Sequence, residues 1–147
     1  MTTRRSRVIA APIADVWRLA TDPHHLPRWW PATDRVEGVS PAGWTSVLST
    51  PRGRTVRADY SVAATDPPVL ARWRQDLAGT PFERLFSELS YELRLTGRDD
   101  GTEAVLALVQ QPRRWARLGR IQLRGAAGRQ LDAALAALAV LVEPPAA

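Results

Sequence analysis

Apolar and polar positions alternate through much of the chain, as is typical of β-strands with one buried face. Turn residues, mostly glycine, proline and aspartate, separate the alternating runs, and Asp100–Gly101 is a strong hairpin signal. The runs predict seven strands, over Arg5–Ala11, Asp34–Ser40, Trp44–Thr50, Arg54–Thr65, Val69–Gly79, Arg84–Thr96 and Thr102–Gln110.

Three other segments carry apolar residues at helical spacing. Pro12 occupies the favoured first position of a short helix through Ala20, and Asp22–Pro23 is typical of the start of a second, which ends near Trp30. The block Trp115–Val142 predicts a terminal helix about 42 Å long. Strands followed by one long helix predict a single α+β domain over residues 1–147, with the sheet wrapped around that helix.

Composition removes several kinds of chemistry. The 147 residues contain no cysteine, which excludes disulfides, thiol nucleophiles and Cys-ligated zinc. All 20 basic residues are arginine, so Schiff-base chemistry and a P-loop lysine are excluded, and the net charge is +5. The longest apolar run, Ala133–Val142, is about half of a bilayer span, and no signal peptide is evident. We expect a soluble, cytoplasmic protein without a transmembrane segment.

The middle strands should have one charged and one largely apolar face, because side chains alternate with a period of two. Arg72 and Arg74 fall on the charged, solvated face and are therefore poor candidates for ligand contacts. The other face carries polar atoms among its apolar residues: the hydroxyls of Tyr60, Ser87 and Tyr91, the indole N–H of Trp73 and the amide of Gln75. An unpartnered buried polar group costs about 1–3 kcal/mol, so these atoms indicate either internal hydrogen bonds in a filled core or a ligand pocket.

The terminal helix has two unlike halves. Its C-terminal half carries an inward apolar stripe, formed by Leu131, Ala134, Leu135, Leu138 and Val142. The same stripe continues backward through smaller or polar residues, namely Gly128, Ala127, Arg124 and Ile121. The N-terminal half should therefore leave volume beneath it. Gly119, Gly125 and Gly128 are compatible with a kink, with close packing or with space for a ligand.

Two segments resemble the SRPBCC (START-like) superfamily, most closely its bacterial polyketide cyclase/dehydrase and lipid-transport branch. The first runs from Ala11-Pro12-Ile13-Ala14-Asp15-Val16-Trp17 through Thr21-Asp22-Pro23 and Leu26-Pro27 to Trp29-Trp30-Pro31. The second is the closing helix, Leu131 to Glu143. The order of predicted elements agrees over nearly the whole chain.

This resemblance implies a helix-grip fold, in which a curved seven-stranded antiparallel sheet surrounds the C-terminal helix and two short helices separate the first and second strands. It also implies a deep apolar cavity. The superfamily includes lipid carriers, ligand sensors and polyketide cyclases, so fold alone does not select the function. It supplies no universal catalytic residue that could be transferred to this chain.

The candidate ligand contacts combine inner-face residues with aromatic residues at the expected pocket mouth. They are Trp30, Tyr60, Trp73, Gln75, Leu89, Tyr91, Leu93 and Trp115. Phe82 and Phe86 are expected beside Trp115 at the entrance. We assign no catalytic residue, cofactor or metal.

His24 and His25 are the only histidines, and adjacent residues point too far apart to share one metal. A surface position is favoured, and a role as proton carrier at the pocket mouth stays open. The cluster Arg113–Arg124 holds five arginines. Solvation, an anionic membrane surface, an acidic partner or a ligand carboxylate or phosphate could each explain it, whereas double-stranded nucleic acid is not expected.

These observations favour a carrier or sensor that binds a lipid, polyketide or isoprenoid-like molecule in an internal cavity. One alternative is a polyketide cyclase, aromatase or dehydratase that uses the same cavity, with Tyr60 or Tyr91 as acid or hydrogen-bond donor and an imidazole as base. Another is a protein-interaction module that uses the arginine cluster. A monomer and a homodimer are both compatible with the sequence.

Overall fold

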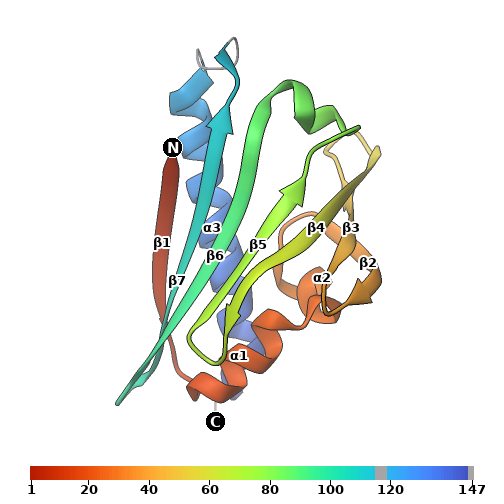
Figure 1. Cartoon of the computed structure of the whole chain (residues 1–147). Coiled ribbons are helices and arrows are strands. Elements are labelled where there is room, and N and C mark those ends of the chain that lie inside the picture. The colour runs from red at the N-terminus through yellow and green to blue at the C-terminus, as the bar shows by residue number, and fades with distance from the viewer. Residues whose placement is uncertain (115–118, 146–147) are drawn as a thin grey trace.

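The computed structural model describes residues 1–114 and 119–145 and consists of one curved sheet with a long helix along one face (Figure 1). The strands are β1 (Thr2–Ile9), β2 (Thr33–Ser40), β3 (Gly43–Ser49), β4 (Thr55–Asp66), β5 (Leu70–Asp76), β6 (Phe86–Arg98) and β7 (Gly101–Pro112). The helices are α1 (Ile13–Thr21), η1 (Pro23–His25), α2 (Leu26–Trp29), η2 (Pro81–Arg84) and α3 (Arg120–Val142).

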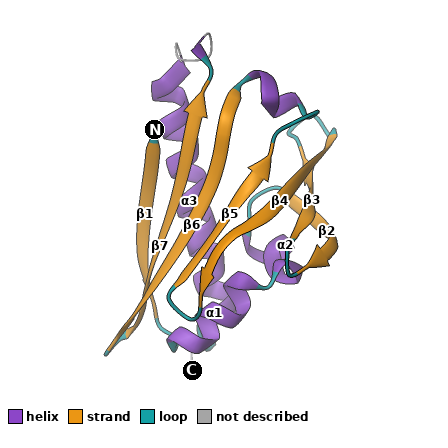
Figure 2. Cartoon of the chain, in the orientation of Figure 1, coloured by secondary structure: helices purple, strands orange, loops and turns teal. Residues whose placement is uncertain are grey.

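All neighbouring strands are antiparallel, and the sheet order is β1-β7-β6-β5-β4-β3-β2. The first strand, β1, pairs with the last strand, β7, and forms one edge of the open sheet. The segments α1, η1 and α2 then connect β1 to β2 at the opposite edge (Figure 2). This arrangement confirms the predicted α+β helix-grip fold with two short helical segments after the first strand.

The outer face of the sheet carries the charges that the alternation predicts. Arg72 lies opposite Glu92 on the neighbouring strand, and its Nη2 is 2.6 Å from a Glu92 carboxylate oxygen. Arg94 binds the other oxygen of Glu92 at 2.5 Å. These ion pairs lie on the side of the sheet away from α3, so the guanidinium of Arg72 is bound to Glu92 on that outer face.

The structure departs from the predicted element bounds at several points. Predicted strand Arg5–Ala11 is Thr2–Ile9, because β1 pairs residue by residue with β7 from Thr2 onward. The strand predicted to reach Gly79 ends at Asp76, because Gly79 has a positive φ of 77° and belongs to the turn before η2. Ser87 is exposed rather than inward, because a register shift between Phe86 and Glu88 turns Phe86 to the inside.

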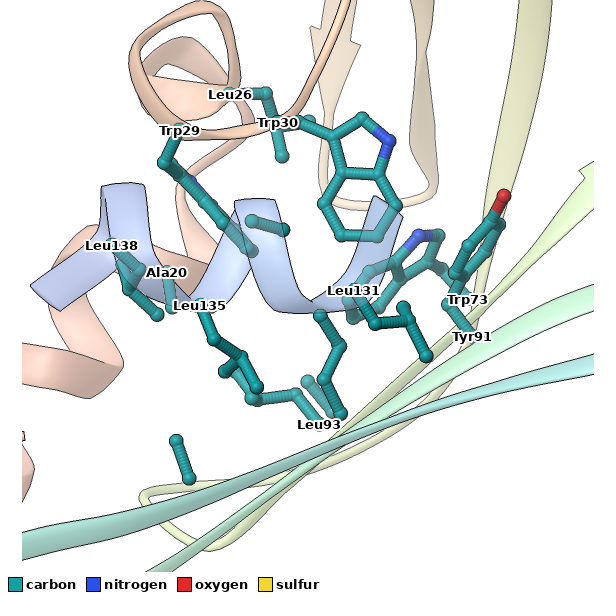
Figure 3. Packing of buried hydrophobic residues seen from close by; sticks show 14 of the residues in the cluster. Ala20, Leu26, Trp29, Trp30, Trp73, Tyr91, Leu93, Leu131, Leu135 and Leu138 are labelled. Carbon is teal, nitrogen blue, oxygen red and sulfur yellow. The ribbon is translucent and has the colours of Figure 1, made fainter. Parts of the chain in front are cut away.

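The concave face beneath the C-terminal half of α3, which is the lower end in Figure 1, is a filled core. Leu131, Leu135 and Leu138 of α3 are at most 2% exposed and pack among Leu93 and Trp29 (Figure 3). By length and composition α3 could cross a membrane, with a mean hydropathy of 1.3 over its most apolar window. In this structure, the sheet covers the inward-facing leucines of α3 with apolar side chains.

The upper half of α3 does not continue the inward stripe. Ala127 and Gly128 are buried as predicted, but Ile121 is 86% exposed and Arg124 is exposed. Gly128 lies against β1, where the guanidinium of Arg5, the end of a flexible side chain, occupies the place that a Cβ would take. This contact is compatible with close packing, one of the three explanations that the sequence left open.

Candidate functional site

Aromatic side chains meet in the middle of the concave face. Trp44 lies opposite Tyr60, and Trp73 lies opposite Tyr91, in directly paired positions of neighbouring strands. Opposite side chains share one face of a sheet, and both pairs stack, with ring centroids 5.2 Å and 5.8 Å apart. Trp30, which follows α2, meets Tyr91 edge-on at 5.1 Å and closes the cluster from above (Figure 3).

We call Trp30, Trp44, Tyr60, Trp73 and Tyr91 the aromatic wall, because a pocket lies on each side of it. One pocket, of about 310 Å³, lies between α1, η1 and the lower parts of β4 and β5; we call it the α1 pocket, and it contains Trp17, Trp44 and Trp73 in its lining. The other has a volume of about 330 Å³ and is lined partly by Trp30, Tyr60 and Tyr91. The wall thus divides the space on the concave face.

The second pocket, which we call the glutamine pocket, contains one row of side chains that crosses four strands. Tyr60 of β4 is opposite Gln75 of β5, and Leu89 of β6 is opposite Gln110 of β7. The pairing of Arg74 with Ser90 places Gln75 beside Leu89, so all four share the row. At the usual strand spacing, the Cα atoms of Gln75 and Gln110 are about 10 Å apart.

Two amides in this row are buried without a hydrogen-bond partner among the described residues. Gln75 is 4% exposed and Gln110 is 7% exposed. The Nε2 atom of Gln75 and the Oε1 atom of Gln110 each lack a protein partner. Each such atom costs about 1–3 kcal/mol unless water or a ligand bonds to it. One unused donor and one unused acceptor therefore belong to side chains of an otherwise largely apolar lining.

The two tyrosine hydroxyls stay protonated over the physiological range. Burial raises the pKa of Tyr91 to about 12, against a smaller lowering by its hydrogen bond with Tyr60. Burial raises the pKa of Tyr60 well above its usual value, and the nearby Tyr91 raises it further. Both hydroxyls can donate or accept a hydrogen bond, but neither can act as a phenolate base near neutral pH.

The described lining of the glutamine pocket contains no acidic, basic or histidine side chain. His24 Nδ1 lies 2.9 Å from Asp22 Oδ1, and His25 Nε2 lies 3.7 Å from Asp22 Oδ2. Asp22 also accepts the His24 backbone N–H at 3.0 Å, which confirms its predicted capping role. Neither histidine lines the glutamine pocket or the α1 pocket. Within residues 1–114 and 119–145, no three His, Asp or Glu side chains are grouped to hold a metal.

The structure brings most of the predicted ligand contacts to one pocket. Those that line the glutamine pocket are Trp30, Tyr60, Gln75, Leu89 and Tyr91, and the predicted entrance residues Phe82 and Phe86 line it too. Trp73 faces the α1 pocket instead, and Leu93 is fully buried in the filled core rather than walling a pocket. Trp115 lies outside the described residues.

Sequence reasoning missed ten lining residues: Pro31, Ala32, Leu48, Ser49, Thr50, Pro51, Val56, Leu108, Gln110 and Gln130. Gln110 and Leu108 belong to the inner face of β7, and the alternation Ala104, Leu106, Leu108, Gln110 would have identified both. Gln130 of α3 lines the pocket from the opposite side, one residue before the buried Leu131. No signal in the helix separates Gln130 from other polar positions.

Comparison with known proteins agrees with this geometry. The family model for polyketide cyclase/dehydrase and lipid transport matches residues 1–143. Among solved structures, the di-domain ARO/CYC protein BexL from the BE-7585A biosynthetic pathway has a TM-score of 0.81 at 14% identity, covering 99% of this chain and 51% of BexL. Protein CV1439 from Chromobacterium violaceum has a TM-score of 0.76 at 20% identity, with 98% of both chains covered.

The protein TTHA0849 from Thermus thermophilus is similar in fold, with a TM-score of 0.75, 20% identity and 97% of both chains covered. No curated protein sequence matches the chain. At these identities the solved structures establish the fold, and the family model establishes the kinship. The chain belongs to the polyketide cyclase/dehydrase and lipid transport family of the SRPBCC superfamily.

Proposed function

We propose that this protein is a carrier or sensor that binds an uncharged hydrophobic molecule in the glutamine pocket. The observation that carries the proposal is the pair of buried amides, Gln75 and Gln110, which line a largely apolar pocket and each hold one polar atom without a protein partner. A ligand with a carbonyl or ether oxygen near Gln75 and a hydroxyl near Gln110 would satisfy both atoms. The family's association with polyketides and lipids supports the same class of molecule.

The charge of the ligand follows from the described lining. A buried carboxylate or phosphate needs a cationic partner, and none of the described lining residues is arginine. The volume of about 330 Å³ is at the lower end of the range for small-molecule sites. A compact keto- or hydroxy-substituted aromatic molecule therefore fits the pocket better than a long-chain fatty acid.

Native mass spectrometry of freshly purified protein, with solvent extraction, tests the proposal. We expect a co-purifying neutral molecule, or loading with an added hydroxyanthraquinone, and weaker loading with palmitate. Recovery of no ligand together with no binding of either probe would refute it.

A matched pair of variants locates the binding. Gln110→Leu removes a buried amide from the pocket, whereas Gln111→Leu changes the adjacent, exposed glutamine on the other face of β7. The first should weaken hydroxyanthraquinone binding about tenfold, and the second should leave it unchanged. Equal effects of the two substitutions would contradict the assignment of the pocket.

An enzymatic function in the same pocket is the second candidate, a polyketide cyclase, aromatase or dehydratase. Its support is the structural likeness to the ARO/CYC proteins BexL and StfQ, with TM-scores of 0.81 and 0.77. Holding a reactive chain in a folded shape accelerates cyclisation without a strong nucleophile. The Tyr60 and Tyr91 hydroxyls would then act as hydrogen-bond donors to a developing enolate, in a pocket whose described lining has no imidazole base.

Tyrosine substitution separates the two candidates. In Tyr60→Phe and Tyr91→Phe, a carrier keeps most of its affinity for the hydroxyanthraquinone, because the rings and the wall remain. A cyclase loses turnover of a poly-β-ketone substrate while binding persists. Both variants should be assayed for binding and turnover with the same protein preparation.

A further inference from the structure

We propose that the upper end of the molecule docks on an anionic membrane through a set of unpaired arginines. We call Arg113, Arg114, Arg120 and Arg124 the arginine rim; the first two follow β7 and the last two lie in the first turns of α3. This inference concerns a surface and stands independently of what the glutamine pocket binds.

The arginine rim forms no ion pair within the described residues, although Asp76, Glu83 and Glu88 line a surface pocket together with Arg113. Residues 104–131 include no aspartate or glutamate. All four rim arginines are exposed, and none forms an ion pair within the described residues. Arg113 Nε donates to the Glu83 backbone carbonyl at 2.6 Å, while the Glu83 carboxylate is occupied by the Gly79 N–H at 3.0 Å.

Some arginines elsewhere on the surface are matched by carboxylates, as Arg72 and Arg94 are by Glu92, and others, such as Arg7 and Arg74, form no ion pair within the described residues. The rim differs in density, because its four exposed arginines all fall within residues 113–124. This concentration of positive charge is complementary to a surface of lipid phosphates. Arginine suits this role because its guanidinium binds phosphate oxygens in a bidentate manner.

Exposed apolar side chains accompany the rim. Ile121 is 86% exposed between Arg120 and Arg124, and Leu85 is 40% exposed. The Arg113 backbone N–H donates to the Leu85 carbonyl at 2.8 Å, so Leu85 lies beside the rim. Exposed apolar side chains beside cations can enter the headgroup region of an anionic bilayer, and this combination favours a membrane over an acidic protein.

The rim also lies at the end of the molecule that holds the glutamine pocket (Figure 1). Arg113 is tied to η2, whose Phe82 lines that pocket. Gln130, another lining residue, follows Arg124 by six residues, or about 9 Å along the helix. A membrane bound at the rim would therefore lie at the same end of the molecule as the pocket.

Charge reversal in the rim is compatible with folding. Arg120 and Arg124 are like charges at i,i+4, and α3 has no acidic residue in its first turn. Replacing them with glutamate places negative charge near the positive end of the helix dipole, where it is favourable. The double variant Arg120→Glu/Arg124→Glu should therefore melt at the wild-type temperature or above it.

Vesicle co-sedimentation tests the proposal with the full chain. The probes are vesicles of phosphatidylcholine alone and of phosphatidylcholine mixed with phosphatidylglycerol, each at low and at high salt. We expect binding to the anionic vesicles only, weakened by salt, and a loss of more than about tenfold in Arg120→Glu/Arg124→Glu. Ile121→Asp should weaken binding in the same direction.

The control is Arg7→Glu/Arg28→Glu, which makes the same change in net charge at two exposed arginines on β1 and α2. It should bind anionic vesicles within about twofold of wild type. Equal losses in the two double variants, binding without anionic lipid, or no binding to either vesicle would overturn the proposal. Ligand loading, measured in solution without vesicles, reports on the glutamine pocket separately.

Discussion

The two ends of the concave face use the same sheet and the same helix in different ways. At the lower end, Leu93 meets Leu131, Leu135 and Leu138, and the space is filled. At the upper end, β5 and β7 carry the inward amides Gln75 and Gln110, and about 330 Å³ is left open. Along β7, the inward residue changes from Leu106 over the core to Gln110 beside the pocket.

Replacing a leucine with alanine should give the largest difference in unfolding free energy between the two ends. Leu135→Ala, in the filled end, should lower the free energy of unfolding by about 2–5 kcal/mol, because it creates a new cavity. Leu89→Ala borders existing space and should cost about 2 kcal/mol or less. Denaturant titration measures both, and equal losses would mean that the upper end is packed as tightly as the lower.

The loss of stability at alkaline pH should depend on the ionisation of Tyr91. Below pH 10 the tyrosine is protonated in both states; above it, the unfolded form ionises first, because burial raises the folded-state pKa to about 12. Stability should therefore fall as pH rises from 10 towards 12, by roughly 3 kcal/mol for this residue. Tyr91→Phe should flatten the decline in denaturant midpoint. An unchanged slope would show that the Tyr91 hydroxyl is hydrated in the folded state.

Removing the pocket amides should stabilise the ligand-free protein. Gln75→Leu and Gln110→Leu each delete a buried polar atom without a partner and should raise the free energy of unfolding by about 1 kcal/mol. A gain in stability with a loss of binding would identify these residues as maintained for a ligand. If either substitution destabilises the protein, its amide already has a water partner in the folded state.

The smallest effect is expected on the outer face of the sheet. Glu92→Gln weakens the contacts with Arg72 and Arg94, yet exposed pairs of this kind contribute less than about 1 kcal/mol. The loss in unfolding free energy should stay below that value and shrink further at high salt. A larger loss would place this ion-pair cluster among the main stabilising features of the fold.

The alternation of residues predicted much of this architecture, and bulges limited it. Tyr60, Gln75 and Tyr91 face inward because the period of two is unbroken around them. Val62 also lies on this face, opposite Trp73, and is 39% exposed because it lines the α1 pocket. Ser87 was misassigned because the register shifts between Phe86 and Glu88, and one extra residue in a strand reverses the side chains on one side of it relative to the other.

The helical pattern of the sequence did not predict which residues of the upper half of α3 face inward. Periodicity placed Ile121 and Arg124 inward, yet the position of a helix over a sheet depends on contacts with distant strands. The Arg5 guanidinium against Gly128 is such a contact, between residues far apart in the sequence. Gln130 lines the pocket for the same reason, so its place became visible only with the fold in hand.

The aromatic wall has one consequence for how this scaffold varies. Four of its five rings stand on the sheet, but Trp30 is delivered by the segment after α2. One boundary of the glutamine pocket therefore depends on a side chain that can change without disturbing any strand. A small residue at position 30 would enlarge this pocket, while the four rings on the sheet would still stand between it and the α1 pocket, so one indole limits the size of an occupant.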